Sequence, residues 1–314
     1  MAEKAYPPVV MPDHVGRTAV TVWSDGYALD ADIYRPTDLA DGERLPAVVL
    51  AHGWGGSKLT AERYAALFAA SGMIALTFTQ ATWFGSDARL QQVDRTVPVE
   101  GVGPMEVRPI RDLVDPFAWI AGVRAALDYI EGEPNVDTDR IGLWATSFGG
   151  GIAVRQAADD RRVKALVVQV AAISGLRGPA LEMARRRAVE TARGDAPALP
   201  QGVDPWPSMS GTPFLAHLAH YDPLSVVDRL RMPTLIMDAG NEEFFATVDN
   251  GHAAAEIIRA NGVPVDYHVI PGIDHYGIYF DGYEFGSTHA LAWWQRYLFE
   301  PSTTLDPTND WRTQ

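Results

Sequence analysis

The stretch Leu143-Trp144-Ala145-Thr146-Ser147-Phe148-Gly149-Gly150-Gly151 joins an apolar run to a series of glycines, and it decides the fold. A serine between a buried strand and a glycine-opened helix is typical of a nucleophile elbow, a strained turn that lifts the hydroxyl above a sheet. The usual pattern is Gly-x-Ser-x-Gly, and here Ala145 replaces the first glycine with one extra methyl group. Such a serine also suits a turn or a helix N-cap, so the surrounding sequence must decide whether Ser147 is a nucleophile.

Apolar runs alternate with amphipathic helical segments on both sides of this stretch. The pattern predicts eight strands, over residues 18–23, 27–34, 47–51, 74–79, 141–145, 165–170, 234–237 and 267–270. Helices are expected over 60–70, from Asp115-Pro116 onward, and over 152–158, 252–260 and 288–299. This alternation predicts an α/β protein with a mostly parallel, doubly wound sheet of eight strands, and the turn Ser24-Asp25-Gly26 predicts an antiparallel hairpin at its edge.

The 314 residues fit one domain, 1–314, with an insertion over about 174–230 where the alternation lapses. The insertion holds an Ala/Arg-rich helix and a Pro/Gly stretch. We expect a helical cap at the carboxyl edge of the sheet, where it would wall a pocket. The alternative is a surface excursion with a small core of its own.

Composition excludes several classes of function. The net charge of −14, without a basic stripe, disfavours nucleic acid as a partner. The absence of cysteine removes disulfides, thiolate metal sites and thiol nucleophiles, which favours a cytoplasmic protein. No secretory signal or membrane-spanning run is recognisable, so we expect neither export nor a membrane partner.

The loop His52-Gly53-Trp54-Gly55-Gly56 follows an expected buried strand and precedes the elbow. A loop in this place can direct a backbone N–H at a reacting carbonyl oxygen. We therefore expect the amides of Trp54 and Phe148 to form an oxyanion hole. His52 precedes the nucleophile, whereas the general base should follow it, so His52 is expected to be structural.

The candidate general base is His275, in the loop Pro271-Gly272-Ile273-Asp274-His275-Tyr276-Gly277 after the last expected strand. An imidazole there could accept the Ser147 proton and return it to the leaving group. The other histidines fit less well, because they lie in a strand, in the terminal helix or in the insertion: His268, His289, His217 and His220.

The orienting acid should follow the strand 234–237. Glu242 is preferred because the loop should return there toward His275, with Glu243 and then Asp238 as the alternatives. Asp238 should still belong to the end of the strand.

Several aromatic residues are candidates for the walls of a substrate pocket, although each could equally be core. They are Trp83, Phe84, Trp206, Phe214 and Tyr276.

The order of elbow, acid and histidine, with the histidine-glycine loop before them, resembles the α/β-hydrolase superfamily over nearly the whole chain. Within it, 241–245 and 271–279 resemble dienelactone-hydrolase-like proteins, particularly fungal polyketide transferases and thiohydrolases. The resemblance implies the α/β-hydrolase fold and a serine nucleophile, which Ser147 matches. Ala145 and a glutamate acid depart from the wider pattern.

The implied activity is cleavage of a carboxylic ester or thioester through an acyl-enzyme, without a cofactor or metal. The glycines after Ser147 lack a P-loop lysine and the dinucleotide fingerprint. Two alternatives stay open: an acyltransferase that uses the same residues, and a non-catalytic binding protein on the same fold. The expected partner is a small-molecule ester or thioester, and the chain could form a homodimer.

Overall fold

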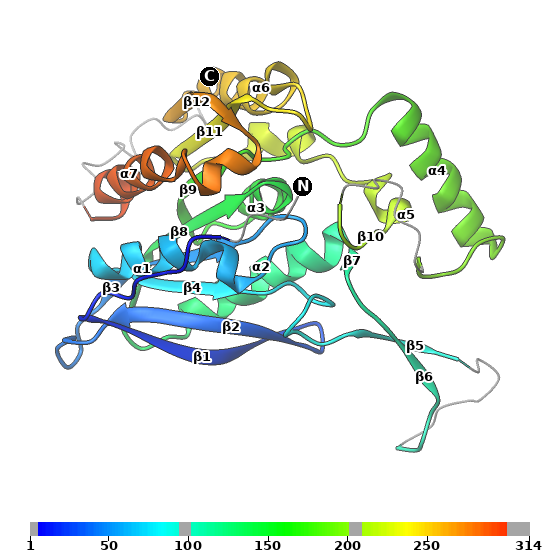
Figure 1. The fold of residues 1–314 in the computed structure, drawn as a ribbon, viewed down its shortest axis with the longest axis horizontal. Coiled ribbons are helices and arrows are strands. Elements are labelled where there is room, and N and C mark those ends of the chain that lie inside the picture. Colours follow the sequence, from blue (N-terminus) through cyan, green and yellow to red (C-terminus); the bar gives the residue numbers. More distant parts are fainter. Residues whose placement is uncertain (1–5, 94–101, 201–208, 300–314) are drawn as a thin grey trace, which may run out of the picture.

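The structure, a computed structural model, describes residues 6–93, 102–200 and 209–299. Its centre is an eight-stranded sheet in the order β1-β2-β4-β3-β8-β9-β11-β12 (Figure 1). These strands are β1 (Val15–Ser24), β2 (Tyr27–Pro36), β3 (Leu45–Ala51), β4 (Ile74–Phe78), β8 (Val136–Thr146), β9 (Val163–Gln169), β11 (Thr234–Asn241) and β12 (Val265–Asp274). All eight expected strands are present.

The parallel strands of the sheet are the ones covered by helices, and the antiparallel pair lies at one edge. The six strands from β4 to β12 run parallel, and the inner ones are short apolar runs because helices cover both of their faces. β1 and β2 pair antiparallel at one edge, around a turn in which Asp25 and Gly26 both have positive φ. The predicted fold class, an α/β-hydrolase fold with a mostly parallel sheet, is confirmed.

Two layers of helices enclose this sheet. The helices are α1 (Glu62–Ala70), α2 (Pro116–Glu131), α3 (Phe148–Ala157), α6 (Gly251–Ala260) and α7 (Tyr283–Trp294), with short helices η1 (Lys58–Ala61), η3 (Thr247–Asp249), η4 (Tyr276–Tyr279) and η5 (Gln295–Phe299). Side chains of α2, α3 and α6 form one core cluster with the sheet, and those of α1 and α7 form a second. Successive residues of β3 divide between the two clusters, because side chains alternate along a strand.

The start of α2 shows how local sequence sets an element boundary. The Asp115 carboxylate accepts hydrogen bonds from the backbone N–H groups of Phe117 and Ala118. Pro116 occupies the first helical turn, where its missing N–H removes no hydrogen bond. The expected cap and proline therefore start the helix where the sequence predicts.

The segment 174–230 contains α4 (Gly178–Arg193), β10 (Thr212–Pro213), α5 (Leu215–Leu218) and η2 (Pro223–Arg229). Figure 1 shows α4 standing away from the sheet, and Ala184 is the only residue of α4 that is buried. β10 pairs with β7 (Leu113–Val114) and so ties the segment to the start of α2.

The sequence did not predict a two-stranded ribbon that precedes α2. β5 (Arg89–Gln92) and β6 (Val107–Ile110) form an antiparallel ribbon within what the sequence indicated only as a long loop. Figure 1 shows this ribbon projecting from the rest of the molecule. No helix within the described ranges is long and apolar enough to cross a membrane.

Candidate active site

Ser147 lies in the sharp turn between β8 and α3. Its φ of 55° and ψ of −130° are strained for a residue with a side chain. Neighbouring backbone holds this conformation: the Ser147 N–H donates to Gln169 O at 3.0 Å, and Ser147 O accepts from the N–H groups of Gly150 and Ala172. The geometry is that of the expected elbow.

The glycines after Ser147 do not form a turn before a helix at Ile152, as the sequence suggested. They lie inside α3, which begins at Phe148. A Cβ on Gly149 would lie 2.1 Å from His52 O, and one on Gly151 would lie 2.1 Å from Ala172 O. Glycine is therefore needed because α3 packs directly on neighbouring backbone, which sequence periodicity does not reveal.

His52 is a structural residue of the preceding loop. Its Nδ1–H donates to Gly53 O at 2.7 Å, and its Nε2 accepts the Gln80 N–H at 3.0 Å. Burial lowers the pKa of His52 to about 4, so the ring is neutral at neutral pH. Both nitrogens are engaged in holding the loop, as expected of a histidine that is not the base.

The loop brings Trp54 beside the elbow. A Cβ on Gly53 would lie 2.6 Å from Ser147 Cβ, so the loop and the serine are in direct contact. The rings of Trp54 and Phe148 meet edge to face with centroids 5.6 Å apart, and both residues line the cavity at Ser147. Trp54 Nε1–H donates to Ser210 O, which links this loop to the insertion.

Ser147, His275 and Glu242 form a hydrogen-bonded relay, although they are far apart in sequence. Ser147 Oγ lies 2.9 Å from His275 Nε2, and Glu242 Oε2 lies 2.8 Å from His275 Nδ1. With the imidazole proton on Nδ1, the serine hydroxyl donates to Nε2 and Nδ1–H donates to the carboxylate. The side chains of His275 and Glu242 are only 4% and 2% exposed, so water does not compete for this contact.

The two alternative acids occupy different positions. The Glu243 carboxylate accepts the backbone N–H of His275 at 3.0 Å, not the ring. Asp238 is fully buried within β11, where Tyr267 Oη–H donates to its Oδ2 at 3.1 Å. Burial chiefly, with the charge of Glu242, raises the pKa of Asp238 to about 7. Of the three candidates, Glu242 is the one whose carboxylate hydrogen-bonds the imidazole.

The remaining histidines lie elsewhere. His268 in β12 and His289 in α7 contact each other with ring centroids 4.8 Å apart. His217 Nδ1 lies 2.7 Å from Asp115 Oδ1, and its ring stacks on Phe214. Over residues 6–93, 102–200 and 209–299, no group of three or more His, Asp or Glu side chains could hold a metal ion.

Ser147 and His275 open into a cavity of about 520 Å³. Its walls are mainly apolar and come from the elbow, the acid loop and the insertion. Residues lining it that the sequence analysis missed include Leu176, Arg177, Met209, Leu218, Tyr221, Phe244 and Phe245. Phe244 and Phe245 lie in the same loop as Glu242, just after Glu243, and this proximity was the available signal. The insertion as a whole was expected to wall a pocket, but no signal singled out its individual lining residues, because their contact with the site depends on tertiary packing.

Of the aromatic residues expected at the pocket, Tyr276 lines it. Three others do not line the cavity, contrary to the expectation. Trp83 is buried in the core, with its ring centroid 6.2 Å from that of Trp119. Phe84 is 89% exposed on the surface, and Phe214 is buried in a separate small core. Trp206 lies outside the described residues.

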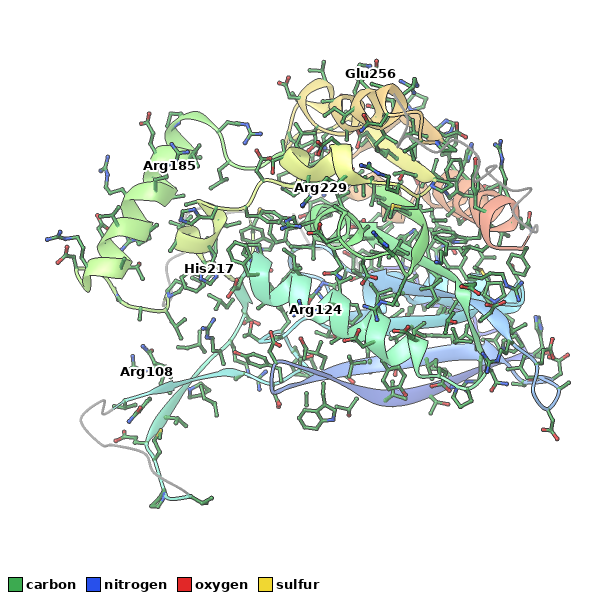
Figure 2. The ribbon with its side chains drawn as sticks, turned by 180° about the vertical axis from the view of Figure 1, so that it is seen from behind. Arg108, Arg124, Arg185, His217, Arg229 and Glu256 are labelled. Carbon is green, nitrogen blue, oxygen red and sulfur yellow. The ribbon has the colours of Figure 1, made fainter. Side chains whose placement is uncertain are left out.

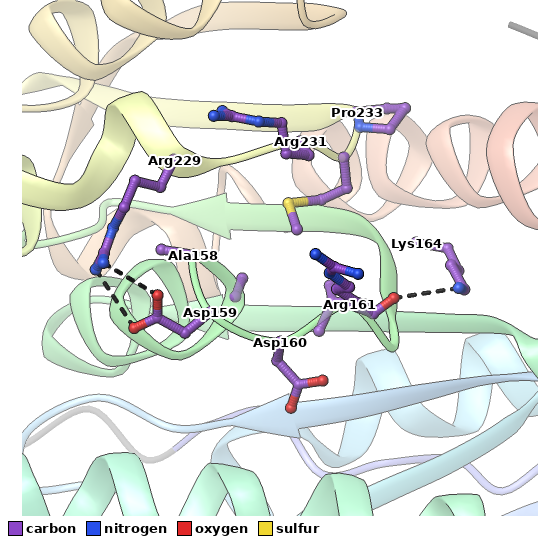
Figure 3. Close-up of a pocket in the computed structure, with 11 residues that line it drawn as sticks. Ala158, Asp159, Asp160, Arg161, Lys164, Arg229, Arg231 and Pro233 are labelled. Carbon is purple, nitrogen blue, oxygen red and sulfur yellow. Dashed lines mark hydrogen bonds and ion pairs between the residues drawn. The ribbon is translucent and has the colours of Figure 1, made fainter. Parts of the chain in front are cut away.

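A larger open groove, of about 710 Å³, lies before β9 (Figure 3). Ser147 follows the carboxyl end of β8, and β8 and β9 are parallel, so the groove and the serine are at opposite ends of the sheet. The charges in the groove are partly paired: Arg229 Nη1 lies 3.2 Å from Asp159 Oδ1, and Lys164 Nζ donates to Arg161 O. The described residues that line the groove include no serine, threonine or histidine.

Comparison with known proteins defines the family. The model of the X-Pro dipeptidyl-peptidase (S15 family) matches residues 25–183, a region that includes the loop 52–56 and the elbow. The chain belongs to this family.

Two curated relatives match part of the chain. The quorum-quenching protein AidA of Acinetobacter baumannii is 32% identical over 149 residues, which cover 46% of this chain and 41% of that protein. The thiohydrolase aneE of Aspergillus aculeatus is 28% identical over 123 residues, 39% of this chain and 32% of that protein. The matched regions are thus less than half the length of either relative.

Solved structures extend the likeness in fold to nearly the whole chain. The α/β hydrolase GrgF from Penicillium sp. sh18 superposes with a TM-score of 0.67 at 18% identity, over 90% of this chain and 99% of that one. The dienelactone hydrolase of Anabaena variabilis superposes with a TM-score of 0.55 at 16% identity, over 91% and 99% of the two chains. The expected resemblance in fold to dienelactone-hydrolase-like α/β-hydrolases is confirmed.

Proposed function

We propose that this protein is a serine hydrolase that cleaves a carboxylic ester or thioester through an acyl-enzyme. The observation that carries the proposal is the relay of Ser147, His275 and Glu242, with distances of 2.9 and 2.8 Å, whose serine and histidine line a mainly apolar cavity. A nucleophile, a base and an orienting acid within hydrogen-bond distance are the groups that acyl transfer needs.

In the proposed first step, Ser147 Oγ attacks the acyl carbon while its proton passes to His275 Nε2. The buried Glu242 carboxylate fixes the Nδ1–H tautomer beforehand and stabilises the imidazolium that forms. His275 then gives the proton to the departing alcohol or thiol. In the second step a water molecule, deprotonated by His275, attacks the acyl-enzyme and regenerates Ser147.

The negative oxygen of the tetrahedral intermediate would bind to the backbone N–H groups of Trp54 and Phe148. Phe148 is the first residue of α3, where backbone N–H groups have no acceptor within the helix and the helix dipole favours negative charge. The His52 hydrogen bonds to Gly53 O and Gln80 N support a loop that is rigid before substrate binds. Donors fixed in this way need little reorganisation during the reaction.

The cavity supports an apolar or aromatic acyl group as the substrate class. Phe244, Phe245 and Tyr276 provide aromatic wall on the acid side, and Leu176 and Leu218 provide aliphatic wall from the insertion. We therefore assign 174–230 as a cap that shapes the pocket. The likeness to a protein named as a thiohydrolase supports thioesters beside oxygen esters.

Amide cleavage is the second candidate, because the family model that matches the elbow region is that of a dipeptidyl-peptidase. Acyl transfer to an alcohol or amine would use the same relay with a different acceptor. A purely ligand-binding role is disfavoured, because it gives no reason to hold a strained serine against a buried histidine–carboxylate pair.

The test is hydrolysis of p-nitrophenyl esters of increasing acyl length, of an acyl thioester and of a matched p-nitroanilide. Ser147→Ala and His275→Ala are assayed identically after their folding has been checked by circular dichroism. We expect ester and thioester turnover that falls by at least about 10³-fold in both variants. Faster cleavage of the anilide than of the esters would favour the peptidase, and dominance of the transfer product when an alcohol competes with water would favour the transferase. Wild-type activity that survives in Ser147→Ala would refute the proposed mechanism.

A further inference from the structure

A second strained residue lies beside Ser147, at the end of the neighbouring strand. Val170 directly follows β9, and its φ is 41°. A β-branched residue rarely adopts a positive φ, because its Cβ then crowds the following carbonyl group. Val170 is fully buried, and its N–H donates to Met237 O at 2.6 Å. Its surroundings therefore hold Val170 in a conformation that the residue itself disfavours.

The turn at Val170 supplies the main-chain groups that fix the nucleophile. Gln169 O accepts the Ser147 N–H, and the Ala172 N–H donates to Ser147 O, each at 3.0 Å. Val170 lies between Gln169 and Ala172, so a change in its φ would redirect the chain that carries the Ala172 N–H. The strained conformation of Ser147 therefore depends on the strained conformation of Val170.

One buried side chain holds this turn in place. Asn250 is fully buried, and its Nδ2–H donates to Ala171 O. Its Oδ1 accepts the N–H of Ile173 at 2.7 Å and the N–H of Ser174 at 2.8 Å. We call these three hydrogen bonds the Asn250 clamp. A carboxamide suits this position because it offers a donor and an acceptor side by side without a charge. The clamp thus fixes the chain that follows Val170.

Asn250 is itself fixed, because α6 begins directly after it. Its backbone O accepts the Ala254 N–H at 3.0 Å at the start of the helix. Figure 2 shows Glu256 on the outer side of α6, and Ile258 of the same helix is buried in the core. The loop that carries Glu242 leads through η3 into Asn250. The clamp therefore joins the acid side of the relay to the nucleophile side.

We propose that Asn250 is a positioning residue for Ser147: the clamp holds the strained turn at Val170, and this turn holds the serine in the conformation from which it attacks. The inference rests on the proposed serine chemistry. Strained backbone persists only where neighbouring contacts hold it. Loss of the clamp would let Val170 relax and would withdraw the Ala172 N–H from Ser147 O. The serine would then have to be brought back into position during the reaction, at a cost in rate.

The clamp also contacts the cap, and this contact provides the alternative to be tested. Ser174 lies where the insertion begins, and it lines the cavity. If Asn250 served mainly to place the cap, its loss would change KM and the preference for acyl length. If it places Ser147, its loss lowers kcat by the same factor for all esters.

The first test measures the reactivity of Ser147 itself. A small alkyl fluorophosphonate phosphonylates an activated serine with loss of fluoride and needs no fit to the cap. At a temperature where circular dichroism shows each protein to be folded, Asn250→Ala should react at least about 30-fold more slowly than the wild type. Its kcat for short and long p-nitrophenyl esters should fall by a common factor, with KM unchanged within about threefold. An unchanged phosphonylation rate, or a change confined to KM, overturns the proposal.

Two further variants complete this test. Asn261→Ala is the matched control, because Asn261 lies at the other end of α6, where its Nδ2–H donates to Asp228 O at 3.0 Å. Its phosphonylation rate should equal that of the wild type. If Asn250→Ala does not fold, Asn250→Asp replaces it, since the carboxyl group keeps the size and the acceptor and loses the amide donor to Ala171 O. Asn250→Asp should react at least about threefold more slowly than the wild type, and an unchanged rate overturns the proposal.

The second test asks whether Val170 transmits the effect. Glycine adopts a φ of 41° without strain, whereas alanine keeps the strain, and both substitutions remove most of the same buried side chain. In the Asn250→Ala background, Val170→Gly should therefore react with the phosphonate at least about fivefold faster than Val170→Ala. With Asn250 intact the two should agree within about twofold, because the clamp sets φ. Equal rates in the two double variants would show that Val170 transmits nothing and would overturn the proposal.

The phosphonate also separates this inference from the proposed function. A wild type that is phosphonylated at Ser147 but cleaves no ester or thioester would refute the proposed activity, and the variants would still decide the role of Asn250. Ester hydrolysis that persists unchanged in folded Asn250→Ala would refute only the positioning role. A wild type whose Ser147 does not react with the phosphonate overturns both.

Discussion

His275 is held twice by consecutive glutamates: its backbone N–H donates to the Glu243 carboxylate at 3.0 Å, while its ring Nδ1 lies 2.8 Å from Glu242 Oε2. The two contacts act on different parts of the residue. Glu243 fixes the main chain that carries the imidazole, and Glu242 fixes the ring and its charge. Phe244 continues the same loop, with its ring centroid 4.8 Å from that of His275, and limits rotation of the imidazole.

The first prediction separates these two glutamates. Glu242→Gln removes the charge that stabilises the imidazolium, so kcat for ester hydrolysis should fall by about 10²–10⁴-fold with little change in KM. Glu243→Gln keeps a side-chain oxygen that can accept the His275 N–H, so its kcat should fall by less than about tenfold. Steady-state kinetics of both variants provide the measurement. A larger loss in Glu243→Gln than in Glu242→Gln would show that the acid has been assigned to the wrong residue.

The second prediction concerns the packing of α3. Gly149→Ala would place a methyl carbon 2.1 Å from His52 O, which is backbone and cannot move aside easily. The free energy of unfolding should fall by about 3 kcal/mol, and activity should fall with it because the loop 52–56 beside Ser147 is displaced. Urea denaturation gives the stability, and the ester assay gives the activity.

Gly103→Ala is the control for that experiment. A Cβ on Gly103 would have no heavy atom within 4 Å. Its free energy of unfolding should stay within about 0.5 kcal/mol of the wild-type value. If the two variants were equally stable, the close contact between α3 and the loop 52–56 would have to be abandoned.

Sequence reasoning could predict the sheet because its signal is local. The inner parallel strands are continuous apolar runs, and all eight predicted strands coincide with strands of the sheet. The order of Ser147, Glu242 and His275 along the chain could be predicted for a similar reason, since each follows a strand whose carboxyl end faces the same edge.

The pocket could not be predicted in the same way. Trp83 and Phe84 are neighbours in sequence, yet one is in the core and the other is 89% exposed, because a turn at Thr82 with φ of 74° and the packing of Trp119 decide their directions. The sequence did not predict the ribbon of β5 and β6, because each of its strands is only four residues long. Short strands without a buried face leave too weak an alternation to recognise.

The third prediction concerns acyl-chain preference. Leu218 and Phe245 line the cavity, so Leu218→Ala or Phe245→Ala should enlarge it and shift the ratio of kcat/KM toward longer acyl esters by about tenfold. Phe84→Ala is the control, since Phe84 lies outside the cavity and its ratio should not change. The measurement is a competition between short and long p-nitrophenyl esters. An unchanged ratio in both cavity variants would mean that the acyl group binds elsewhere.

The fourth prediction is a pH dependence of stability that arises from Asp238. Burial chiefly raises its pKa to about 7, whereas in the unfolded chain an aspartate titrates near 3.9. The folded state therefore binds this proton more tightly than the unfolded state, and the contribution of Asp238 to stability is lost as pH rises from about 4 through 7.

Asp238→Asn cannot ionise, so its melting temperature relative to the wild type should increase between about pH 5 and about pH 9, an effect worth a few kcal/mol at most. A constant offset between the two proteins reflects only the hydrogen bonds of the new amide, so the slope is the quantity to compare. Parallel curves for Asp238→Asn and the wild type would show that Asp238 is ionised in the folded protein at neutral pH, with its charge compensated by a group other than Tyr267.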